Sequence, residues 1–203
     1  MTGSHIRSLT TIAAALALVA VATHAQSPSL PSDGRSLSIE RSTDIPPPLL
    51  AAMRKAECRQ DDALLLAFPI ELFRPSPASS PMAIVPCAGG VLSGRAFMFD
   101  RDQQREPEPV AFPVMAFPGR VSASETPGVL SWNPYARTLT AVEGNDECDG
   151  VVARHTYRHD DRRGGDDLNG FALAKVERGK LGCFGAGENW QLIWEATDAR
   201  QPQ

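Results

Sequence analysis

VVARHTYRH, residues 151–159, is the stretch that most directly indicates the fold. In an extended chain its odd-numbered residues, from Val151 to His159, fall on one face and its even-numbered residues on the other. Valine, threonine and tyrosine also favour extended backbone. The stretch is bounded by ECDG at 147–150 and by DDRRGGDD at 160–167, and both segments are rich in turn-forming residues. We therefore predict a β-strand here.

The two histidines of this strand, His155 and His159, are four residues apart. Zinc binds imidazole nitrogens at ~2.0–2.1 Å, so two ligands of one ion must lie close together. Four residues of a strand span ~13 Å, which is too far unless the strand bends. We therefore expect partly exposed histidines on a strand, and we assign no metal ligand and no cofactor. A metal site that uses His155 and His159 is the alternative if the strand bends.

Segments of the same kind recur along the chain. Short apolar or alternating runs, broken by glycine and proline, are typical of antiparallel sheets. They lie at residues 64–73, 82–87, 95–101, 110–117, 138–144, 169–179 and 189–197. In one run Phe97 and Phe99 alternate with Ala96 and Met98, so both faces of that strand should be covered. Pro69 argues against a helix over 64–73 and favours an edge or bulged strand.

One short helix is predicted where the folded region begins. DIPPPLLAAMRKAEC, residues 44–58, starts with Asp44, a residue type that caps helices, and with prolines that suit a first turn. Strong helix formers follow, and the helix should end near Glu57. Residues 26–45 are polar and rich in serine and proline, so we predict a flexible leader there. Residues 46–200 then form a single, mainly β domain with one N-terminal helix.

The N-terminus has the pattern of a secretory signal peptide. Arg7 precedes an apolar run, TIAAALALVAVA at 11–22, and small residues at Thr23 and Ala25 fit cleavage after Ala25. The run is shorter than the ~20 residues that span a bilayer, and no later segment is longer. We therefore expect residues 1–25 to be removed, export to the periplasm, and no transmembrane segment afterwards. A net charge of −4 without a basic cluster makes nucleic acid a poor partner.

Four cysteines follow this signal, and in an oxidising compartment an even count indicates disulfides. Their three connectivities are not equally favoured, because "EC" recurs at 57–58 and 147–148 and each is followed by a second cysteine. This weak symmetry suggests two similar halves, at 46–104 and 110–200, with one bridge in each. The predicted pairs are Cys58–Cys87 and Cys148–Cys183.

Catalytic motifs are weak. A nucleophilic Cys148 with a histidine would need a free thiolate, which a disulfide removes. GVLSGR at 90–95 lacks the glycine two positions before Ser93 that a nucleophile elbow needs. We therefore assign no catalytic residue.

The tryptophans suggest ligand contacts instead. Trp132 and Tyr135, predicted to lie in the turn SWNPYARTL at 131–139, are the better ligand-facing pair, with His155 and His159 as further candidates. Trp190 and Trp194 alternate on one predicted strand face, which favours a place in the core.

The quoted segments, in order, resemble a family of exported proteobacterial proteins called domain of unknown function 1176. The resemblance runs from Cys58 to Ala196 and depends on ECRQDDALLLAFPIELF, the VPCAGG turn, and LGCFGAGENWQLIWEA near the end. It implies export to the periplasm and carries no activity. We expect a non-enzymatic binding or envelope-interaction module with an unknown envelope or periplasmic partner. The alternative is a hydrolase-like enzyme that acts on an envelope component, using His155 or His159 with the acids at 160–167.

Overall fold

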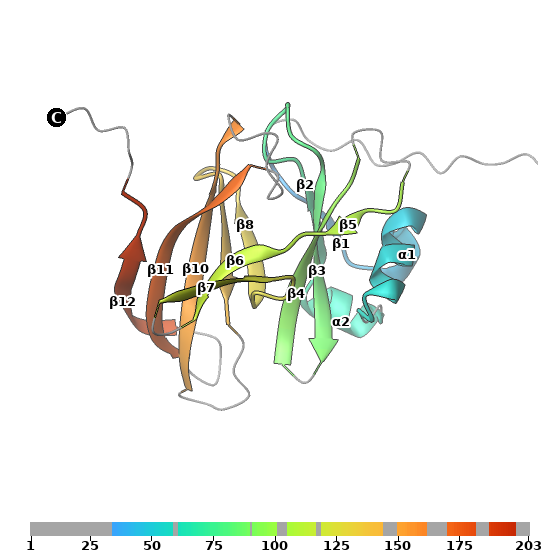
Figure 1. Cartoon of the computed structure of the whole chain (residues 1–203). Coiled ribbons are helices and arrows are strands. Elements are labelled where there is room, and N and C mark those ends of the chain that lie inside the picture. The colour runs from blue at the N-terminus through green and yellow to red at the C-terminus, as the bar shows by residue number, and fades with distance from the viewer. Residues whose placement is uncertain are drawn as a thin grey trace, which may run out of the picture.

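The computed structural model is built from two five-stranded antiparallel sheets with two helices on one side (Figure 1). The prediction of a mainly β, antiparallel fold is confirmed. The structure describes residues 34–58, 61–89, 91–100, 105–116, 119–143, 150–161, 170–181 and 187–197. The predicted signal peptide, Cys148 and Cys183 lie outside these residues.

The N-terminal sheet has its strands in chain order. They are β1 (Leu37–Ile39), β2 (Ile70–Phe73), β3 (Met82–Gly89), β4 (Val91–Met98) and β5 (Glu108–Pro109). Both faces of this sheet are covered, as the alternation at 95–101 predicts. Phe97 packs on the side of the helices, and Ala96 packs on the side of the second sheet.

Two short helices, α1 (Pro47–Lys55) and α2 (Asp62–Ala67), cover the first face. α1 is the predicted helix, but Asp44 does not cap it; this carboxylate pairs with Arg41 at 2.9 Å in a 3-10 turn, Ser42–Asp44. α2 corrects the first part of the strand predicted over 64–73, while its last part is confirmed as β2, Ile70–Phe73. The Asp61 carboxylate accepts a hydrogen bond from the Leu64 N–H at 2.9 Å and caps this helix, while Pro69 lies beyond its end.

The segment predicted to be a flexible leader is partly ordered. Within residues 26–45, β1 pairs with β2 and places Ser38 opposite Glu71. The carbonyl of Gly34 accepts a hydrogen bond from the Trp132 indole at 2.7 Å, and Ile39 and Ile45 are buried. Two isolated apolar residues in a polar sequence were enough to anchor this segment, because each fills a site under the helices.

The C-terminal sheet is also a run of consecutive strands. They are β8 (Val129–Asn133), β9 (Thr138–Val142), β10 (Gly150–His159), β11 (Phe171–Leu181) and β12 (Gly187–Glu195), and β12 and β8 form its edges. The strand predicted from VVARHTYRH is confirmed as the central strand β10, with its odd-numbered residues from Ala153 to His159 buried. Whether the two sheets arose by duplication stays a prediction.

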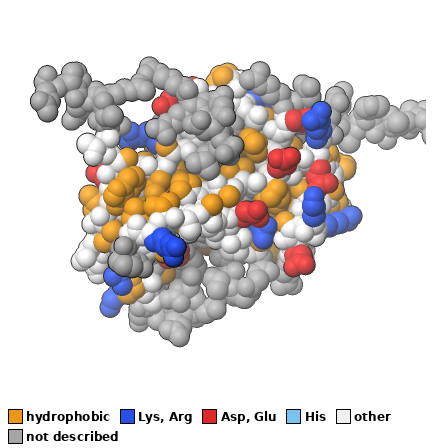
Figure 2. Space-filling model, in the orientation of Figure 1, with side chains coloured by type: hydrophobic (Ala, Val, Ile, Leu, Met, Phe, Trp, Pro, Cys, Tyr) orange, Lys and Arg blue, Asp and Glu red, His pale blue; other side chains and the backbone are white. Residues whose placement is uncertain are grey.

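A hairpin of β6 (Phe112–Ala116) and β7 (Arg120–Ser124) crosses the inner face of the C-terminal sheet (Figure 1). Side chains of β10 bond to the backbone of β6. The His155 ring accepts from the Met115 N–H at 2.9 Å, and the Tyr157 hydroxyl donates to the Pro113 carbonyl at 3.0 Å. Figure 2 shows apolar side chains gathered on this side of the molecule, where Val121 of β7 is exposed.

Two apolar layers hold the fold together. One lies between the helices and the N-terminal sheet, and the other lies between the two sheets. In the second layer Phe73 stacks on Trp132, with ring centroids 4.7 Å apart, and Trp132 meets the edge of Phe171 at 5.9 Å. Burial of each such side chain contributes ~1.5–3 kcal/mol to stability.

The two sheets join at a pair of glycines. The Gly94 N–H donates to the Gly128 carbonyl at 2.8 Å. A Cβ on Gly94 would lie 3.1 Å from the Leu130 nitrogen. A Cβ on Gly128, which has a φ of +126°, would lie 2.1 Å from the Val142 oxygen. Only glycine permits this approach of β4 to β8.

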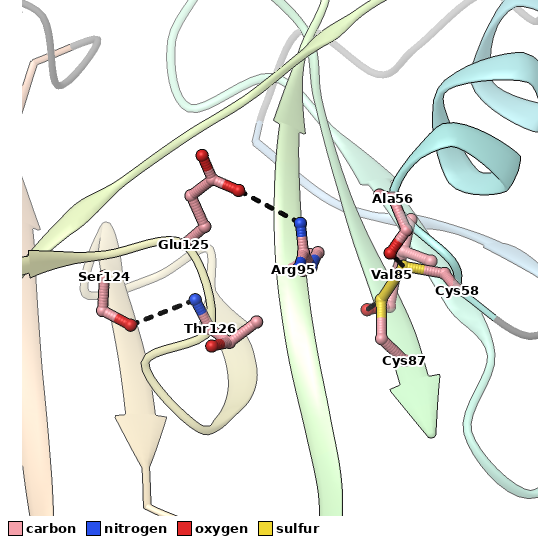
Figure 3. Close-up of polar contacts among 8 residues, drawn as sticks. All are labelled: Ala56, Cys58, Val85, Cys87, Arg95, Ser124, Glu125 and Thr126. Carbon is pink, nitrogen blue, oxygen red and sulfur yellow. Dashed lines mark hydrogen bonds and ion pairs between the residues drawn. A yellow bond between two sulfur atoms is a disulfide. The ribbon is translucent and has the colours of Figure 1, made fainter. Parts of the chain in front are cut away.

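The Cys58–Cys87 disulfide links the chain after α1 to β3 and confirms that predicted pair (Figure 3). Its loop spans 29 residues, and both cysteines belong to the layer beneath the helices.

Candidate functional site

The two histidines do not lie partly exposed as predicted. His155 is fully buried and His159 is 6% exposed, because both project from β10 onto the inner face of the sheet. Each ring has a different set of partners, so the two do not form one site. Among the described residues, no three histidine, cysteine or acidic side chains gather to hold a metal ion. Asp166 and Asp167, two of the predicted acids, lie outside those residues.

His155 is positioned to support the hairpin. Because its Nε2 accepts from Met115, the neutral ring carries its hydrogen on Nδ1. Within the described residues that Nδ1 is buried without a hydrogen-bond partner. Burial lowers the pKa of His155 below its ordinary value, which the nearby Glu143 carboxylate offsets only in part. The ring is therefore neutral near pH 7.

His159 belongs to the group of described residues that most resembles a catalytic site. Its Nε2 lies 3.0 Å from the Ser79 hydroxyl, and its Nδ1 lies 3.6 Å from the Asp161 carboxylate. This order of serine, imidazole and carboxylate resembles an acyl-transfer triad. Sequence reasoning did not single out Ser79, which lies 80 positions before His159 in the loop that joins β2 to β3.

The hydrogen-bond directions oppose nucleophilic chemistry at this cluster. Arg137 lies 2.8 Å from Nδ1 of His159, and a guanidinium only donates, so Nδ1 must accept. The hydrogen is then on Nε2 and is donated to Ser79, whereas a general base would accept the serine proton there. The cluster therefore links the two sheets through polar contacts, and we call Ser79, Arg137, His159 and Asp161 the polar clasp. A hydrogen bond from Ser76, together with those of Arg137, lowers the pKa of Asp161 and keeps this carboxylate ionised.

The predicted aromatic pair is not brought together. Trp132 lies in β8, not in the turn, and is buried against Phe73. Tyr135 is 90% exposed in the turn that follows. Trp132 is buried because residues alternate along β8, an edge strand, and Leu130 and Trp132 share its inner face.

The prediction that Trp190 and Trp194 share a core-facing side is wrong. A bulge in β12 places Trp194 opposite Val176 and Leu192 opposite Glu177, so the two β12 residues face opposite ways. Trp194 is 36% exposed at the sheet edge. Trp190 lies on the outer face, where the Arg154 guanidinium stacks 4.2 Å from its ring centre.

A cavity of about 130 Å³ lies beside the glycine junction, between the two sheets. Most of its walls are apolar, and its rim includes the exposed Ala67 and Phe68 at the end of α2. The described residues that line it are Ala67, Phe68, Pro69, Glu71, Ile84, Pro86, Ser93, Gly94, Val129 and Leu130. Glu71 is the one ionisable residue among them.

Among the described residues, no group forms a hydrogen bond with Oε2 of the Glu71 carboxyl. Its Oε2 is buried without a hydrogen-bond partner, and burial raises the pKa of Glu71 above its ordinary value. A buried, unpaired polar atom costs ~1–3 kcal/mol. Strained or unsatisfied groups of this kind are concentrated at functional sites. This cavity is therefore the candidate binding site.

Sequence reasoning did not select Glu71. The signal that could have found it is a single acid within the apolar run FPIELF, at 68–73.

The fold and the cavity together define a two-sheet antiparallel β protein with a small, apolar, acid-bearing site between its sheets. No family model matches the chain, and no curated protein or solved structure matches it. In the described part of the chain, no helix has the length and apolar character needed to cross a bilayer.

Proposed function

We propose that this protein is an exported, non-enzymatic binding module that holds a small group of a ligand in the Glu71 cavity. The observation that carries the proposal is Glu71, the one ionisable residue among the described residues that line the cavity, whose carboxylate has no hydrogen-bond partner at Oε2. Apolar walls with one oriented polar group are typical of ligand sites. The signal-like N-terminus and the resemblance to the domain of unknown function 1176 family support a periplasmic location and an envelope or periplasmic partner.

The cavity limits the size of the group. An engineered apolar cavity of ~150 Å³ binds benzene, so about 130 Å³ accommodates about six non-hydrogen atoms. The exposed Ala67 and Phe68 leave an entry for such a group, which can belong to a larger molecule.

The test uses five-carbon probes and two matched variants. Backbone amide NMR shifts are recorded while n-pentylamine, 1-pentanol or pentanoate is added to the mature protein. At least one probe should shift the amides of Gly94 and Leu130. Ala67→Phe, which narrows the rim, should weaken that binding at least tenfold, whereas Ala63→Phe, also exposed on α2 but not lining the cavity, should not. Absence of binding by all three probes would overturn the proposal.

A further inference from the structure

We propose that the group bound in the Glu71 cavity is a primary ammonium on a short apolar stem, held by the ionised carboxylate. This inference rests on the proposed function, because it names the chemistry of that same site.

Two donors among the described lining residues are already used within the protein. The Ser93 hydroxyl donates to the Cys87 carbonyl at 3.0 Å, and the Gly94 N–H donates to Gly128 at 2.8 Å. The other described lining residues carry no polar side chain except Glu71 itself. Neither of these donors is directed at the Glu71 carboxylate, so a ligand in the cavity can supply one, and an ammonium brings three.

The charges around the cavity also favour a cationic ligand. The described lining residues from α2, β3, β4 and β8 include no titratable group. Ser38, opposite Glu71 on β1, is exposed and uncharged. The nearest cation in sequence to the cavity wall, Arg95, points toward Glu125 and pairs with it at 3.1 Å (Figure 3). An anionic ligand would meet a second negative charge, whereas a cation would pair with the ionised Glu71 carboxylate.

The cavity volume fits a primary ammonium with a short stem. A short alkyl stem of about five carbons fills a cavity near 130 Å³ and covers the apolar walls of Ile84 and Leu130.

This chemistry couples binding to proton release. Glu71 binds the ammonium in its ionised form, and its raised pKa means that some of the free protein holds a proton there as the pH falls. Affinity for n-pentylamine should therefore increase with pH until Glu71 is ionised in the free protein. At higher pH the affinity should stay constant until the amine itself loses its proton, at a pKa near ~10.4 by analogy with lysine. A neutral ligand that accepts a hydrogen bond from protonated Glu71 would show the opposite trend.

The experiment measures dissociation constants for n-pentylamine, 1-pentanol and pentanoate between pH 5 and pH 8.5 by amide NMR shifts on the mature protein. We expect the amine to bind at least tenfold more tightly than the alcohol at pH 8, with affinity that rises with pH. Glu71→Gln, which keeps the shape, should weaken the amine about tenfold and remove the pH dependence. It should leave the alcohol within threefold.

Two outcomes separate the ideas. If 1-pentanol or pentanoate binds as tightly as the amine, or if amine affinity falls as pH rises, the ammonium assignment is overturned while the binding module stands. If no probe binds, the proposed function itself fails. Unchanged amine binding in Glu71→Gln would also overturn the assignment, because the carboxylate would then play no part.

Discussion

Removal of the Cys58–Cys87 bridge should lower the free energy of unfolding by about 3.6 kcal/mol in the double variant Cys58→Ala/Cys87→Ala. The magnitude follows from the closed loop of 29 residues, since the chain-entropy relation gives ~12 cal/mol/K for a loop of that length. At 25 °C this reduces the folded-to-unfolded ratio several hundredfold. Loss of the two buried sulfur atoms adds ~1 kcal/mol.

The assay is urea denaturation followed by tryptophan fluorescence, for which the buried Trp132 is a reporter. Because the bridge acts mainly by restricting the unfolded chain, the m-value should rise when it is removed. The single variant Cys58→Ala also lacks the bridge and should lose nearly as much as the double variant. A loss below ~1.5 kcal/mol in the double variant would refute the reasoning.

Three further predictions concern the junction, His155 and Ser79. Gly128→Ala should cost more than ~4 kcal/mol in chemical denaturation because its Cβ would meet the Val142 oxygen at 2.1 Å. Gly119→Ala, with φ +89° but no atom within 4 Å, should cost only ~1–2 kcal/mol, and equal losses would contradict the account. The lowered pKa of His155 means that the unfolded chain binds the proton first, so its stabilising contribution is complete above pH 6.5 and is lost as the pH falls through its folded pKa. His155→Gln, which retains an acceptor for the hairpin, should therefore lose less stability between pH 7 and pH 5 than the wild type, and parallel curves would refute this. A fluorophosphonate should leave Ser79 unlabelled in the folded protein, and labelling detected by mass spectrometry would show that the hydrogen-bond directions assigned at the clasp are wrong.

Local alternation predicted much of the sheet structure. β10 and the two-sided burial around Phe97 could be derived from sequence because a period of two fixes which side chains share a face. The Cys58–Cys87 pair also followed, since the repeat of EC at 57–58 and 147–148 favours sequential pairs. The strand predictions depend on residues close together in the chain.

One error was local: Asp61 caps α2 through one hydrogen bond, which outweighed the extended character of the apolar run. The other errors arise where contacts between separate strands decide. A single bulge in β12 turned Trp194 away from the face of Leu192. His155 is buried because a hairpin that lies 40 residues earlier supplies its partner, Met115. The environment of Glu71 is formed by residues from several separate elements, and a pattern of neighbouring residues in the sequence does not reveal which elements meet there.

The strand order has a consequence for how the chain folds. Every strand of the N-terminal sheet precedes residue 110, and so do its helices and its disulfide. A chain that emerges N-terminus first can therefore complete this half as a unit before the second sheet exists. Until then the face that carries Phe73 and Ile84 is uncovered, and it becomes a template on which Trp132 later docks. The interval between the two events is the period in which this protein is most open to aggregation, and in which a holding chaperone would have most effect.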